Sequence, residues 1–60
     1  MMYFVIHKAS DGQFYFVIKS DNNEIVATSE LYPYKSTAKS TIESIKNNVD
    51  KSSLVIDITE

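Results

Sequence analysis

Residues 25–47 constrain the fold of this 60-residue chain more than any other part of its sequence. They read IVATSELYPYKSTAKSTIESIKN, which is typical of a strand end, a short tyrosine-rich loop and one amphipathic helix. Pro33 ends the strand and Ser36 is the expected N-cap, so we predict a helix over residues 37–48. Most residues outside its apolar stripe are mediocre helix formers, so packing on a sheet must hold the helix. The stripe recurs at helical spacing: Ala38, Ile42, Ile45 and Val49.

A β-hairpin is predicted at the start of the chain. The tetrapeptide Tyr-Phe-Val-Ile occurs at residues 3–6 and again at 15–18, on either side of the turn signal Ser-Asp-Gly at 10–12. A two-residue Asp-Gly loop and a three-residue Ser-Asp-Gly loop give opposite faces to the strands. We favour the three-residue loop with a left-handed Gly12, because it gathers five large apolar residues on one face. The pairs it predicts are Phe4 with Ile18 and Ile6 with Phe16.

Two further strands complete the expected fold. A tight type I′ turn at Asn22-Asn23 leads into a strand over residues 24–29. In that register Ile25, Ala27 and Ser29 share the face of Phe16 and Ile18, while Val26 and Thr28 lie on the other side. After a polar linker at 50–53, residues 54–58 alternate as a last strand, with Leu54, Ile56 and Ile58 facing the core. We therefore predict an α+β fold of order β-β-β-α-β, an antiparallel meander with one helix packed on one face. The side chains expected to be most buried are Phe4, Ile6, Phe16, Ile18, Ile42 and Ile45.

The length predicts a single domain, over residues 1–60, that needs help to be stable. A chain of this size buries only ~60% of its unfolded surface and usually needs a disulfide, a metal or a partner chain. The sequence has no cysteine and one histidine, so neither a disulfide nor a zinc-thiolate or multi-histidine site is available. Oligomerisation is the remaining source of stability.

Charge and hydropathy exclude several classes of protein. Six lysines, no arginine and eight carboxylates give a net charge of −2, whereas a general phosphate binder is normally basic. The apolar runs at residues 3–6 and 14–18 are far shorter than the ~20 residues of a membrane span. Met1-Met2 leads straight into a strand pattern without a basic region, so no signal peptide is expected. The expected compartment is the cytoplasm.

The order and spacing of short motifs along nearly the whole chain resemble the YegP-like family of small bacterial domains. The motifs are Tyr3-Phe4, Asp11-Gly12, residues 14–19, Asn22-Asn23, Ala27-Thr28-Ser29-Glu30, Tyr32, Lys35 and residues 42–48. The resemblance implies β-β-β-α-β units, two in tandem or one per chain, that join into one sheet by exchanging their C-terminal strands. A one-unit chain such as this would then be a homodimer. The resemblance implies no activity and no cofactor.

No residue pattern in the chain predicts an active site. His7 is the only imidazole, and no nucleophile elbow, triad order or glycine-rich loop surrounds it. The Ser29-Glu30 pair is expected to bond its own backbone at the strand end. Tyr32 and Tyr34 are expected to cover the sheet end or the start of the helix. We therefore expect no enzyme, and no catalytic, metal or cofactor-binding residue.

The outward face of the sheet is the strongest candidate for a binding surface. An exposed apolar patch usually marks a contact surface, so an interaction or structural role is the preferred function. The alternative is weak binding of single-stranded nucleic acid on the tyrosines, which the scarcity of nearby cations disfavours. The partner would be an unidentified protein. The candidate contact residues are Tyr3, Val5, His7, Tyr15, Val17 and Lys19.

Overall fold

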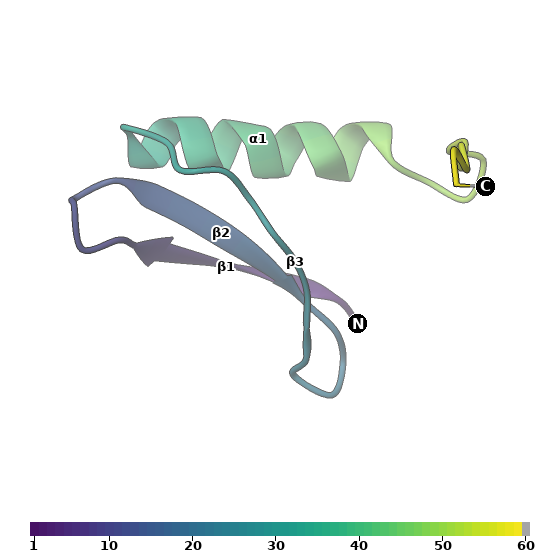
Figure 1. Ribbon diagram of the computed structural model, residues 1–60, viewed down its shortest axis with the longest axis horizontal. Coiled ribbons are helices and arrows are strands. Elements are labelled where there is room, and N and C mark those ends of the chain that lie inside the picture. Colours follow the sequence, from purple (N-terminus) through teal and green to yellow (C-terminus); the bar gives the residue numbers. More distant parts are fainter. Residues whose placement is uncertain (60) are drawn as a thin grey trace.

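The computed structural model describes residues 1–59 and has the predicted α+β class. Its three strands form one antiparallel sheet in the order β1-β2-β3, and the helix lies across one face of that sheet (Figure 1). The elements are β1 (Tyr3–Lys8), β2 (Phe14–Lys19), β3 (Ile25–Thr28) and α1 (Lys35–Asn48).

The first hairpin has the predicted register and loop. Phe4 pairs with Ile18 and Ile6 with Phe16. The Ala9 amide donates to the Gln13 carbonyl at 2.7 Å, which leaves three residues in the loop. Gly12 has a φ of 87°, a conformation that favours glycine because it has no Cβ. The Asp11 carboxylate accepts hydrogen bonds from the side chain and backbone of Gln13, and these bonds lower the pKa of Asp11.

The second turn differs from the predicted type I′ link. The Ser20 amide donates to the Glu24 carbonyl at 2.9 Å, so the loop holds three residues, and only Asn23 has a positive φ, 66°. The extra loop residue is offset by a β-bulge at Val26, because Lys19 pairs with Ile25 while Ile18 pairs with Ala27. Ala27 therefore keeps its predicted place opposite Ile18. Ile25 does not, since the bulge moves it to the face that carries Lys19.

The core between the sheet and the helix is small. Phe16, Ala38 and Ile42 are buried, and half-buried apolar residues pack around them: Phe4, Ile6, Phe14, Ile18, Tyr32 and Ile45. The predicted list of most buried residues was therefore right for two of its members, Phe16 and Ile42. Ala38 is fully buried because the helix approaches the sheet closely at this small side chain. Val17, on the opposite face, is as buried as Phe16, at 4% exposure.

The ends of α1 differ from the predicted ones. The helix begins at Lys35, and its N-cap is Tyr34, whose side chain makes no capping hydrogen bond. Ser36 is therefore not the cap: it lies in the first turn, where Thr37 and Ala38 donate to the Tyr34 carbonyl instead. Val49, expected in the apolar stripe, is the extended C-cap residue and is exposed. The stripe ends at Ile45 because the backbone leaves the helix at Val49.

The strand predicted at residues 54–58 is not formed within the single chain. No regular element follows α1 in the part of the chain that the structure describes. The segment lies beyond the C-terminal end of α1, away from the three strands (Figure 1). A strand needs a neighbouring backbone to pair with, and none is close to this segment in the single chain.

Candidate interaction surfaces

The structure brings the six predicted contact residues together on the outer face of the sheet, the face without the helix. Across the first hairpin, Tyr3 lies opposite Lys19, Val5 opposite Val17, and His7 opposite Tyr15. The rings of His7 and Tyr15 stack with centroids 5.2 Å apart. The Tyr3 hydroxyl donates to the Asn23 side chain, which ties this tyrosine to the second turn.

The centre of this face is nevertheless not available for contact. Val17 is buried between Val5 on β1 and Thr28 on β3. Beside it lies an open groove of about 610 Å³, which we call the outer groove. Ile25 and Leu31, which are 62% and 49% exposed, line it together with His7, Tyr15, Val17, Thr28 and Ser29. Only the bulge at Val26 puts Ile25 there, so the regular alternation of the strand could not have predicted this surface.

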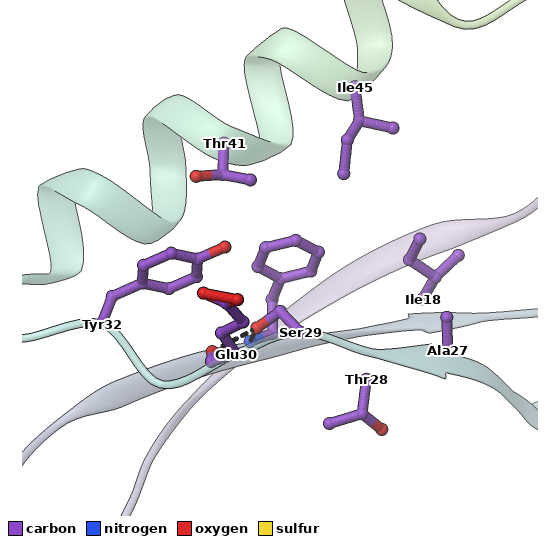
Figure 2. A pocket seen from close by; sticks show the side chains of 9 residues that line it. Ile18, Ala27, Thr28, Ser29, Glu30, Tyr32, Thr41 and Ile45 are labelled. Atoms are coloured by element: carbon purple, nitrogen blue, oxygen red, sulfur yellow. Dashed lines mark hydrogen bonds between the residues drawn. The ribbon is translucent and has the colours of Figure 1, made fainter.

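A second groove, of about 500 Å³, opens between α1 and β3 and is called the inner groove. Figure 2 shows Ile45 pointing from the helix toward Ile18, with Ala27 beside them on β3. Tyr32 closes one end, with its ring stacked on Phe16 at a centroid distance of 6.4 Å. Thr41 borders it from the helix. The wall is mostly apolar, so an apolar segment can fill this groove.

The two grooves meet at the end of β3. Thr28 and Ser29 line both of them, and Figure 2 shows Thr28 pointing away from the inner groove. The Ser29 hydroxyl accepts from the Phe16 amide at 2.9 Å and donates to the Glu30 carbonyl at 2.8 Å. As predicted, this serine makes hydrogen bonds with backbone groups. Its hydroxyl therefore links the backbone of β2 to the end of β3.

Glu30, Tyr32 and Thr41 bring polar groups to the inner groove. Within residues 1–59, no three histidine, cysteine or carboxylate side chains gather where they could hold a metal ion. His7 stacks on Tyr15, while Asp11 is engaged with Gln13 at the hairpin turn. Tyr32 covers the sheet as expected, whereas Tyr34 is exposed. In the same described range, no helix is long and apolar enough to cross a membrane.

The C-terminal segment, residues 54–58, is the most exposed apolar part of the described chain. The exposed fractions are 87% for Leu54, 94% for Val55, 78% for Ile56 and 89% for Ile58. Asp57 accepts hydrogen bonds from the hydroxyl and amide of Thr59, which lower the pKa of Asp57. Four aliphatic side chains within five residues are unfavourable in water, so this segment has surface that a partner could cover.

A family comparison assigns the chain. The family described as Domain of unknown function (DUF1508) matches residues 9–55. The chain belongs to the DUF1508 family. This confirms the resemblance to YegP-like proteins that the sequence motifs indicated.

The curated relatives of the chain are longer proteins. The UPF0339 protein YegP of Escherichia coli K12 is 46% identical over 46 residues, which cover 77% of this chain and 42% of YegP. A UPF0339 protein of Pseudomonas aeruginosa is 49% identical over 45 residues, which cover 75% of this chain and 41% of that protein. The match therefore spans about two fifths of the length of these curated relatives.

One solved relative has nearly the same extent as this DUF1508 chain. The solution structure of a protein from Haloferax volcanii superposes with a TM-score of 0.75 at 26% identity. The superposition covers 93% of this chain and 95% of that one. The β-β-β-α arrangement is therefore shared with a protein that has the length of a single unit.

Proposed function

We propose that this DUF1508 chain is a non-enzymatic interaction module that works as a homodimer, in which each copy lends its C-terminal segment to the other. The observation that carries the proposal is the exposure of residues 54–58, from 78% to 94% for the four aliphatic side chains. Burying a Leu, Ile or Val side chain fully contributes ~1.5–3 kcal/mol, so covering this segment outweighs a substantial ordering cost. A symmetric exchange closes as a two-fold dimer and leaves no further segment free.

The lengths of the relatives support this proposal. Each matched region fills about two fifths of the curated relative, so such a protein has room for a second unit of the same size. Two copies of this chain would bring two units together by association, whereas one longer chain can hold two units by covalent linkage. Linkage raises the effective concentration of the second unit to the millimolar range, whereas separate chains need enough mutual contact to associate.

Sedimentation of the full chain and of a chain truncated after Ser53 tests the dimer. We expect the full chain to sediment as a dimer at micromolar concentration, and the truncated chain to be a monomer of much lower stability. The matched control keeps the length and replaces the apolar residues Leu54, Ile56 and Ile58 by serine. A full chain that stays a folded, stable monomer at micromolar concentration would refute the proposal.

The outer face is the proposed site for a further partner. Its rim keeps Tyr3, His7 and Lys19 accessible, and the stacked pair His7–Tyr15 gives it a flat aromatic surface. The same pair favours a second candidate function, weak stacking of single-stranded nucleic acid. Lys19 is the one lysine of the six contact residues, and the net charge is −2, so we rank this candidate below a protein partner. A salt-dependent shift with a single-stranded oligonucleotide, lost in Tyr15→Ser, would reverse that order.

A further inference from the structure

The outer groove is a depression in the sheet face that α1 leaves uncovered (Figure 1). Its floor is the buried Val17, which lies opposite Thr28 on β3. Ile25 stands at one end of the groove. Leu31, which directly precedes the bridge between Tyr32 and β2, stands at the other end. The groove therefore has room for a large aliphatic side chain between two aliphatic walls.

The two basic side chains of this face lie at opposite ends of the groove. His7 is opposite Tyr15 at one end, and Lys19 is four residues further along β2 at the other. Four residues of strand span ~13 Å. The lysine ammonium donates hydrogen bonds, and an imidazole keeps one donor even when it is neutral. Both ends can therefore receive a carboxylate.

No carboxylate of the chain balances these two groups. None of the described residues that line the outer groove is acidic. In the turns at the ends of the strands, Asp11 and Glu24 accept hydrogen bonds within their own turn, and Asp21 pairs with the N-terminal ammonium group. Glu30 lines the inner groove instead. This face is therefore basic and apolar on a chain whose net charge is −2.

An extended polypeptide segment fits this arrangement. Alternate side chains of a strand point the same way, ~7 Å apart, so side chains i, i+2 and i+4 span the ~13 Å between the two basic groups. The middle side chain then meets the depression over Val17. Single-stranded nucleic acid fits less well, because its bases stack on free aromatic faces and its backbone needs several cations. His7 already covers one face of the Tyr15 ring.

We propose that the outer groove binds an extended segment of a partner protein in which carboxylates lie two residues before and two residues after one large aliphatic side chain. The aliphatic side chain lies between Ile25 and Leu31, and the carboxylates lie at His7 and Lys19. This inference rests on the interaction role proposed for the outer face and gives the chemistry of its partner. Complementary charges of this kind fix the orientation of a partner and suppress binding of wrong ones.

Capped synthetic peptides test the chemistry. The peptide TETLTET presents glutamate, leucine and glutamate on one side when it is extended, and it is titrated into the full chain labelled with ¹⁵N. We expect saturable shifts of the amides at 17, 25, 28 and 31. The control peptides TKTLTKT and TETSTET should bind ~10-fold or more weakly, since one reverses the charges and the other lacks the aliphatic side chain. Equal binding of all three peptides would overturn the proposal.

A charge reversal separates local attraction from net charge. In Lys19→Glu the preference should invert, so that TKTLTKT binds more tightly than TETLTET. Lys51→Glu, in the turn after α1, makes the same change in net charge and should keep the original order. If Lys51→Glu weakens TETLTET as much as Lys19→Glu does, the proposal is wrong.

Leu31→Ser tests the aliphatic wall without changing charge. This exposed loop residue should tolerate the substitution, and TETLTET should bind ~10-fold more weakly. Val49→Ser, at an exposed aliphatic residue at the end of α1, is the matched control and should bind as the unmodified chain does. Unchanged binding to Leu31→Ser would place the peptide elsewhere and overturn the assigned groove.

Two further outcomes would assign the groove to another occupant. An oligothymidylate that shifts the same amides at lower concentration than TETLTET would make it a nucleic-acid site. Shifts of these amides on dilution of the protein alone would mean that a second copy covers the groove. A full chain that sediments as a monomer but binds TETLTET refutes only the proposed dimer. A dimer that does not bind TETLTET refutes only this inference.

Discussion

At the scale of single residues, a serine hydroxyl closes the sheet where β3 ends. The Phe16 amide, in the middle of the central strand, donates to the Ser29 hydroxyl oxygen and not to a carbonyl. The Ser29 amide in turn donates to the Phe16 carbonyl at 2.9 Å. The chain is thereby released from the sheet and returns at Tyr32, which pairs with Phe14. Leu31 is left unpaired between these points and is free to line the outer groove.

Val17 lies on the face that the sequence assigned to binding, but its burial makes it a structural residue. We expect Val17→Ala to lower the free energy of unfolding by roughly 1.5–3 kcal/mol, because a buried valine loses its packing. Val26→Ala, at the exposed bulge, is the matched control and should change stability by less than ~0.5 kcal/mol. Urea denaturation of both variants measures the difference. If both substitutions lowered the free energy of unfolding equally, Val17 would not be buried on the outer face.

At the scale of elements, the sequence patterns predicted the type and order of β1, β2, β3 and α1 better than their boundaries. The repeated Tyr-Phe-Val-Ile around the Gly12 turn predicted the register of β1 and β2, because only the three-residue loop gathers five large apolar residues on one face. The second turn has no glycine, and its asparagines suit loops of two or three residues equally. The choice was settled by the compensating bulge at Val26, which depends on packing across the sheet. The outer groove, and with it the roles of Ile25 and Leu31, could not be predicted for the same reason.

The start of α1 has an unused opportunity for capping. Tyr34 has an extended backbone, makes no side-chain cap and is exposed, and the first turn contains no acidic residue. We expect Tyr34→Asp to raise the free energy of unfolding by ~0.5–1 kcal/mol. An aspartate there accepts hydrogen bonds from the free backbone amides, and its negative charge interacts favourably with the positive end of the helix dipole. Tyr34→Ala, which removes the ring without adding a cap, is the control. Thermal and urea unfolding should rank Asp above Ala, and the reverse order would mean that the tyrosine ring itself stabilises the helix start.

For the whole molecule, the small core ties the proposed association to stability. Three buried residues form the centre of the core between the sheet and α1, and the largest exposed aliphatic cluster lies outside it at residues 54–58. A chain of this size is marginal alone. In the proposed dimer the same residues that are exposed in one copy complete the core of the other.

The thermal midpoint should therefore depend on protein concentration. Association stabilises the folded state by mass action, so the midpoint of the full chain should rise as concentration increases from the micromolar range. The chain truncated after Ser53 should have a lower midpoint that is the same at every concentration. Calorimetry over a hundredfold dilution series measures both. A midpoint of the full chain that does not move with dilution would mean that folding and association are independent.

The meander also has a consequence for how fast such an assembly can form. Each strand pairs with its neighbour along the sequence, and α1 packs on the strands that precede it. Chains with such local contacts fold in roughly milliseconds or less. The strand exchange of the proposed dimer would instead wait for two chains to meet, at typical rate constants of ~10⁵–10⁷ M⁻¹s⁻¹. The rate of folding would then be set by the chain alone, and the rate of the proposed exchange by the concentration of the protein.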